Sequence, residues 1–208
     1  MKKIDKNFNL SLITLTIAAI LWYLMFVIKL MNFWLEMSSS ILILVVIAVL
    51  IKKDLFNIGK ITSRQITIGV SSFIVLYIIF YIGNILSGYI FPFKNAQISM
   101  VYNNKTQSSL YVIGLLLLLI IGPGEEIYWR GFIQSTFSEK LGETKGYILA
   151  SLIYCGVHII TGNFMLVLAS LVCGLFWGWL YKSEKSLFLV ILSHALWDFT
   201  IFVLLPVK

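Results

Sequence analysis

Residues Leu110 to Arg130 read LYVIGLLLLLIIGPGEEIYWR, a run of apolar side chains that ends in two carboxylates and a guanidinium. Apolar runs of this kind are typical of helices that cross a membrane, which need about 20 such residues. Ionisable groups are expensive in hydrocarbon, so at membrane depth they indicate a functional site by default. This stretch therefore predicts a membrane helix that carries candidate site residues.

The composition extends this interpretation to the whole chain. Of the 208 residues, 60 % are hydrophobic and 12 % are charged, and the mean hydropathy is +0.95. Soluble domains carry about 25 % charged residues. We therefore expect one domain over residues 1–208, an all-α, polytopic integral membrane helix bundle whose surroundings are membrane lipids. Cys155 and Cys173 show no paired spacing, so we expect free thiols.

About seven transmembrane helices are predicted from the apolar segments, because each is close to the length that a bilayer requires. They cover residues 10–31, 35–51, 66–91, 109–133, 146–161, 164–182 and 186–205.

The basic residues predict the orientation of the bundle. The net charge is +7, but the 16 lysines and arginines lie in short segments between apolar spans, a pattern that sets membrane topology and requires no nucleic acid. All of them except Lys29, Lys94, Lys105 and Lys208 fall on the side of the N-terminus. We therefore expect a plasma-membrane protein with a cytoplasmic N-terminus, and a site that opens toward the cytoplasmic side.

The acidic pair divides into two roles by helical spacing. Glu126 and Arg130 are four residues apart with the acid first, the favourable geometry for an ion pair along a helix, and this pair is predicted to be structural support. Glu125 points about 100° away on a helix of 3.6 residues per turn and has no such partner. An unpaired carboxylate in an apolar setting suits a general base. Residues 122–124, Gly-Pro-Gly, are expected to interrupt or kink the helix just before the acids.

The two histidines, His158 and His194, also lie within apolar segments, and Asp198 follows His194 by one helical turn. Two mechanisms remain open from these residues. Glu125, His158, His194 and Asp198 could hold a divalent metal such as zinc, whose catalytic sites use three protein ligands and one open position. Alternatively, no cofactor is needed: Glu125 and His158 activate a water molecule, and His194 stabilises the oxyanion of a tetrahedral intermediate.

These residues resemble the motifs of the CAAX protease and bacteriocin-processing (CPBP) family of intramembrane endopeptidases, which includes the type II CAAX prenyl endopeptidases. The similarity lies within residues 122–198. Its motifs are Glu125-Glu126-x-x-x-Arg130, Tyr154-x-x-x-His158, Gly174-x-x-x-Gly178 and His194-x-x-x-Asp198. The resemblance implies that Glu125 is the catalytic glutamate, that His158 is its partner, and that His194 and Asp198 complete the site. The family commonly has phenylalanine at position 154 and often asparagine at position 198, so the sequence departs from it there.

The leading functional hypothesis is therefore a CAAX-type intramembrane endopeptidase, metal- or glutamate-dependent. The resemblance implies a membrane-associated, lipid-modified or prenylated peptide as substrate, with bacterial roles in peptide processing or self-immunity to bacteriocins. Two alternatives come from other classes. The first is a catalytically silent membrane scaffold or regulatory protein of the same fold. The second is an ion-coupled transporter, which the absence of an inverted repeat in a chain of this length disfavours.

Overall fold

The computed structural model describes residues 2–55 and 60–207, and these residues form helices and no strand. This confirms the all-α prediction. Lys208, which the charge pattern places on the outer side, lies outside the described residues. In chain order the elements are α1 (Lys2–Tyr23), η1 (Leu24–Ile28), α2 (Phe33–Ile51), α3 (Ser63–Ile90), α4 (Lys94–Tyr102), η2 (Asn103–Gln107), α5 (Leu110–Leu116), η3 (Leu117–Ile121), α6 (Gly122–Glu126), η4 (Ile127–Gln134), α7 (Ser135–Leu141), α8 (Glu143–His158), η5 (Ile159–Thr161), α9 (Phe164–Glu184), α10 (Leu187–Phe199) and η6 (Thr200–Leu204).

Within the described part of the chain, six helical stretches are long and apolar enough to cross a membrane. They are Lys2–Ile28, Phe33–Ile51, Ser63–Ile90, Leu110–Leu141, Phe164–Glu184 and Leu187–Leu204. The prediction of about seven is therefore close. The remaining predicted span, 146–161, corresponds to α8, which has 16 residues and so falls short of the roughly 20 that a bilayer requires. The short helix α4 and the turn η2 were not predicted, because their sequence lacks a long apolar run.

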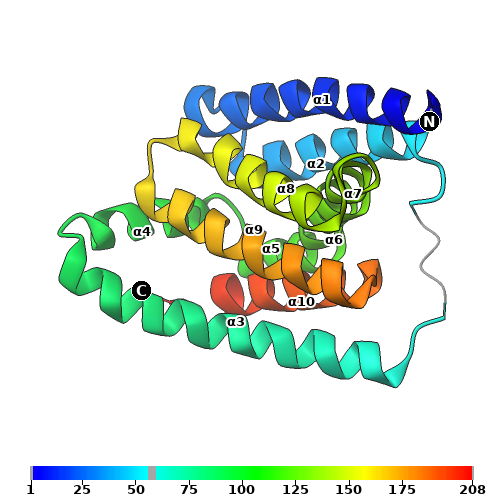
Figure 1. Cartoon of the computed structure of the whole chain (residues 1–208). Helices are drawn as coiled ribbons and strands as arrows, with labels where there is room; N and C mark the ends of the chain where they lie inside the picture. Colours follow the sequence, from blue (N-terminus) through cyan, green and yellow to red (C-terminus); the bar gives the residue numbers. More distant parts are fainter. Residues whose placement is uncertain (1, 56–59, 208) are drawn as a thin grey trace.

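The helices run side by side, and α3 lies along one edge of the bundle (Figure 1). α3 packs mainly against α10, while α10 also packs against α6 and α9. α8 pairs with α9, and α1 packs against α2 and α7. As a result, α6 and α10 occupy the interior, and they carry four of the six polar residues that the sequence singled out, while Arg130 lies in η4 and His158 on α8.

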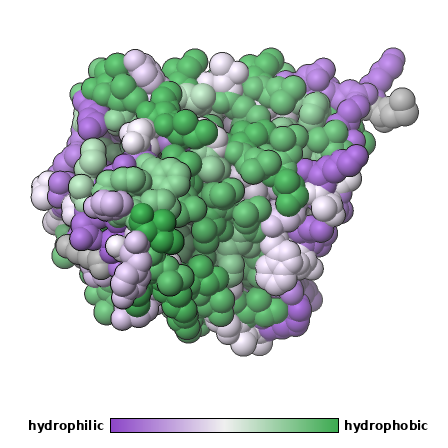
Figure 2. Space-filling model, turned by 60° about the vertical axis from the view of Figure 1, so that its left-hand side comes forward, coloured by the Kyte–Doolittle hydropathy of each residue, from purple (hydrophilic) through white to green (hydrophobic). Residues whose placement is uncertain are grey.

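The surface of the bundle is apolar over a broad band. Figure 2 shows green, hydrophobic side chains across the middle of the molecule and purple, hydrophilic ones toward its two sides. Large apolar side chains such as Leu35, Leu50 and Tyr111 are exposed by 60 %, 71 % and 76 %. In water such a surface would aggregate, whereas in a bilayer it faces lipid tails. The protein is therefore an integral membrane protein.

The fourth span corrects one expectation, because residues 122–124 do not break the helix. The chain stays helical from Leu110 to Leu141, but it changes from α- to π-helical turns on both sides of α6, in η3 and η4. These wider turns accommodate Pro123, which cannot donate a backbone hydrogen bond. The glycines serve close packing instead: a Cβ at Gly122 would lie 2.9 Å from the Cα of Ala195, and one at Gly124 would lie 2.8 Å from Ile41.

Glycines also bring α8 and α9 together. A Cβ at Gly174 would lie 3.1 Å from the carbonyl oxygen of Ser151, and one at Gly178 would lie 2.8 Å from the Ser151 hydroxyl. The Ser151 hydroxyl donates to the Gly174 carbonyl over 2.8 Å. The Gly174-x-x-x-Gly178 motif is therefore a helix-packing face. Cys155 and Cys173 are free thiols, as predicted.

Candidate active site

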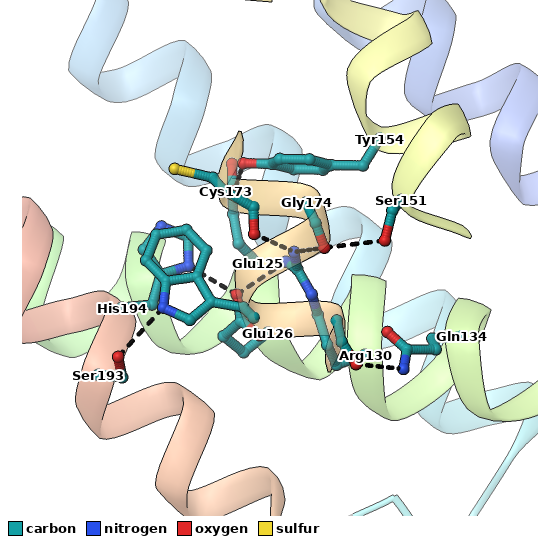
Figure 3. A network of polar contacts seen from close by, with 12 residues as sticks. Glu125, Glu126, Arg130, Gln134, Ser151, Tyr154, Cys173, Gly174, Ser193 and His194 are labelled. Atoms are coloured by element: carbon teal, nitrogen blue, oxygen red, sulfur yellow. Dashed lines mark hydrogen bonds and ion pairs between the residues drawn. The ribbon is translucent and has the colours of Figure 1, made fainter. Parts of the chain in front are cut away.

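Glu125 lies on α6 and is almost completely buried, with 3 % of the residue exposed. The hydroxyl of Tyr154, which comes from α8, donates a hydrogen bond of 2.8 Å to its Oε2 (Figure 3). Among the described residues, no salt bridge joins Glu125 to a cation. This agrees with the helical spacing, which turns Glu125 away from Arg130, and it leaves a buried carboxylate held by a single hydroxyl group.

Glu126, the next residue, has the opposite surroundings. It is fully buried, and its Oε1 lies 2.8 Å from Nη1 of Arg130 and 2.7 Å from Nδ1 of His194. Arg130 also donates from Nη2 to the carbonyl oxygens of Cys173 and Gly174 on α9, at 3.3 Å and 3.4 Å (Figure 3). The predicted i,i+4 ion pair is thus present, and it connects three separate helices.

His194, on α10, lies between two carboxylates. Its Nδ1 contacts Glu126, and its Nε2 lies 3.4 Å from Oδ2 of Asp198, one turn further along the helix. The ring of Trp177 stacks on the imidazole, with ring centroids 3.7 Å apart and planes inclined by 20°. These contacts fix both the plane and the direction of the imidazole.

His158 is held at the end of α8 by two hydrogen bonds. Its Nδ1 lies 2.8 Å from the carbonyl oxygen of Tyr154, which can only accept, so Nδ1 carries the proton. The unprotonated Nε2 then accepts from the indole N–H of Trp22 on α1, over 3.3 Å. The same residue, Tyr154, therefore positions Glu125 through its side chain and His158 through its backbone.

A cavity of about 420 Å³ brings the four predicted catalytic residues together. All four line its wall: Glu125, His158, His194 and Asp198. Glu126 and Arg130 do not line it, so the structure separates the polar residues as the helical spacing predicts, into a group that faces the cavity and a pair that lies behind it.

Residues 107–200 match the family described as "Type II CAAX prenyl endopeptidase Rce1-like". The matched segment contains all six polar residues of the site. The match covers slightly less than half of the chain and supports membership of the CAAX protease family. No curated protein and no solved structure matches the chain. The family match supports an intramembrane protease activity of the CAAX type in general.

Three aromatic residues of the site carry no signal in the sequence that marks them as site residues. Trp177 lies in an apolar segment, and it stacks on His194. The hydroxyl of Tyr154 was noted only as a departure from the family, but it binds Glu125. Trp22 was not singled out, because α1 lies outside the matched segment and shows only an apolar pattern. No spacing rule connects residues 22 and 158, so only the folded chain reveals this contact.

The arrangement does not fit a metal centre. The ring nitrogens of His158 contact Tyr154 and Trp22, and those of His194 contact Glu126 and Asp198. Within the described residues, no three His, Cys, Asp or Glu side chains are grouped closely enough to hold one ion. A metal therefore stays a prediction from the sequence.

The position of the cavity bears on the expectation that the site opens toward the cytoplasmic side. Besides the four site residues, its wall includes Lys29, Asn84, Asn104, Gln107 and Thr161, which come from the helix ends far from the N-terminus (Figure 1). Most lysines and arginines lie at the other end. If the charge pattern places the N-terminus in the cytoplasm, this end of the cavity faces the opposite side, so the two expectations, a cytoplasmic N-terminus and a site open to the cytoplasm, do not hold together.

Proposed function

We propose that this chain is an endopeptidase that hydrolyses a peptide bond within the membrane, with Glu125 as the general base. The observation that carries this proposal is the shared cavity: a buried carboxylate without a cationic partner among the described residues lines the same wall as both histidines. A general base must reach the water that it activates. Glu125 is available for this role because Arg130 and His194 are engaged by Glu126 instead.

The proposed reaction proceeds by addition and elimination. Glu125 accepts a proton from water while the water oxygen bonds to the carbonyl carbon of the substrate, which gives a tetrahedral oxyanion. The C–N bond then breaks, and Glu125 returns the proton to the leaving nitrogen. Tyr154 orients the carboxylate through its hydrogen bond. His158 faces the same cavity from α8, and its Nε2, which accepts a long hydrogen bond of 3.3 Å from Trp22, is shared with the water and so positions it. Proton transfer by such a positioned group contributes about 10²- to 10⁴-fold to rate.

His194 is the proposed stabiliser of the oxyanion. Its Nδ1 is held at 2.7 Å by Glu126, whereas its Nε2 contact with Asp198 is longer, at 3.4 Å. The Nε2–H can therefore be shared between Asp198 and a developing oxyanion. Asp198 is acceptor-only when ionised, so we assign it the orientation of His194 and no direct contact with the oxyanion.

The proposed substrate is a membrane-associated peptide, lipid-modified or prenylated, since the cavity wall is largely apolar and aromatic. Phe26, Phe33, Trp34, Met37 and Leu166 contribute to it. Such walls suit a lipid chain or apolar side chains. In keeping with the resemblance, we propose peptide processing or bacteriocin self-immunity at the plasma membrane, with the N-terminus in the cytoplasm.

The test is cleavage of a library of membrane-anchored peptides, prenylated and unmodified, by the purified protein in liposomes. Wild type is compared with His158→Ala and with Glu143→Gln, a change at an exposed acid on α8. Each is assayed with and without a strong chelator. We expect cleavage by wild type and by Glu143→Gln, a large loss in His158→Ala, and no effect of the chelator. Loss of activity with the chelator would show that a metal takes part after all. No cleavage by folded wild type would favour the silent scaffold.

A further inference from the structure

Glu36 is a buried acid that neither the family motifs nor the proposed reaction uses. It lies near the start of α2, with 5 % of the residue exposed, and it lines the same cavity as Glu125. Within the described residues, its Oε2 has no hydrogen-bond partner. Buried polar groups are almost always paired in native proteins, and a buried charge is costly when it is not. The unpaired Glu36 therefore points to a partner that binds from the cavity.

The packing of α2 gives an approximate separation, along the helix axis, between Glu36 and the reacting centre. Ile41 meets α6 at Gly124, next to Glu125. Glu36 precedes Ile41 by five residues, which is about 7.5 Å along the helix axis at 1.5 Å per residue. An extended peptide covers this distance in about two to three residues. Glu36 thus lies between the proposed reacting centre and the open end of the cavity, where Asn104 and Gln107 also line the wall.

We propose that Glu36 binds a cationic group of the substrate, two to three residues from the bond that is cleaved. This inference rests on the proposed function and names a determinant of its specificity. An ionised carboxylate only accepts hydrogen bonds, so an ammonium or guanidinium group satisfies both its charge and its free oxygen. The apolar side chains beside it, Trp34 and Met37, exclude water and strengthen this interaction. The cation is either a basic side chain or the amino terminus of the peptide.

Lys29 offers an internal alternative, because it lines the same cavity. If it moved to pair with Glu36, the acid would be a structural residue and no determinant of specificity. The effect of Lys29→Gln on the preference for cationic peptides distinguishes the two cases. Under our proposal this change leaves the preference for cationic peptides in place, whereas an internal pair requires that it act like the loss of Glu36.

The experiment measures binding and cleavage of matched membrane-anchored peptides by the full chain in liposomes. In the first pair of peptides, one carries lysine at the second or third position from the cleaved bond and the other carries norleucine there. A second pair compares a free with an acetylated amino terminus. We expect wild type and Glu143→Gln to bind the cationic peptide about tenfold more tightly than the neutral one. In Glu36→Gln this ratio falls to about one, and in Glu36→Asp part of it returns. Thermal unfolding verifies that each variant folds.

Three results overturn the proposal: the same ratio in Glu36→Gln as in wild type, no preference in wild type, or an equal loss in Lys29→Gln. Binding of the peptides is measured separately from cleavage, so the Glu36 site is tested even if no peptide is cut. Preference in binding without any cleavage would contradict the proposed endopeptidase while supporting the cation site.

Discussion

The carboxylate of Glu126 and the imidazole of His194 lie 2.7 Å apart, between Oε1 and Nδ1, and this contact joins α6 to α10 at the centre of the bundle. The same oxygen binds Arg130, which reaches on to the backbone of α9. Glu126 is therefore the point where three helices meet. The preceding residue, Glu125, faces the cavity instead. Consecutive residues on a helix point about 100° apart, and this rotation gives the two adjacent acids different roles.

Replacement of Glu126 by alanine is expected to destabilise the protein by about 3–5 kcal/mol, because it leaves the buried Arg130 without a counter-charge. The matched control is Glu184→Ala, which breaks the ion pair of Glu184 with the exposed Arg64 and should cost at most about 1 kcal/mol. Unfolding of both variants in detergent measures the difference. Equal losses would show that the buried pair is no more important to stability than the surface pair.

The network around Glu126 also shows what the sequence could predict. The two i,i+4 relations, Glu126 with Arg130 and His194 with Asp198, follow from helical spacing within one segment, and both are present. The contact of Glu126 with His194 spans 68 residues and depends on how α10 packs against α6. Periodicity within a helix does not encode that packing, so the connection between the structural pair and the histidine could not be predicted.

The same limit applies to the prediction of the fold, because patterns within one segment do not show how the helices pack. Apolar length located most ends of the six long helices to within about three residues, because the bilayer imposes that length. The first helix begins eight residues before the predicted span, and the fourth ends eight residues after it. It could not reveal α4, which is short, nor the π-helical turns around α6, which depend on Pro123 and on the close approach of α10. The side on which the cavity opens depends on where neighbouring helices separate, and the charge pattern carries no information on this.

Trp22→Phe is expected to lower the rate of peptide cleavage by about tenfold or less, because His158 loses the hydrogen bond to its Nε2 while the aromatic packing of α1 remains. The loss should fall on kcat, since Trp22 positions a residue and donates nothing to the substrate. Trp179→Phe, at a tryptophan exposed by 54 %, is the control and should leave cleavage unchanged. Identical kinetics for both variants would remove Trp22 from the site.

Gly178→Ala is expected to destabilise the pair of helices α8 and α9 by about 1–3 kcal/mol, the usual cost of overpacking. The new methyl group would lie 2.8 Å from the Ser151 hydroxyl and 2.9 Å from the ring of Tyr147. Gly156→Ala provides the contrast, because a Cβ there meets no atom within 4 Å and alanine favours a helix by up to about 1 kcal/mol. The two melting temperatures should shift in opposite directions, and a shared direction would contradict the packing described.

The charge pattern predicts which end of the protein faces the outside of the cell, and the cavity lies toward that end. In a variant with Cys155 and Cys173 replaced by alanine, single cysteines are introduced at Thr106, beside the open end, and at Lys145, at the other end. A membrane-impermeant thiol reagent added to whole cells should label Thr106→Cys and leave Lys145→Cys unlabelled until the cells are lysed. The reverse pattern would place the N-terminus outside and the cavity toward the cytoplasm.

The most direct measurement is the single-turnover rate of peptide cleavage in liposomes for Glu125→Gln beside Glu143→Gln. Glutamine keeps the size of Glu125 and an acceptor for the Tyr154 hydroxyl, but it cannot take a proton from water. We predict that Glu125→Gln loses about 10²-fold or more in rate while it folds and inserts normally, and that Glu143→Gln cleaves as wild type does. Cleavage by Glu125→Gln at the wild-type rate would contradict the assignment of Glu125 as the general base.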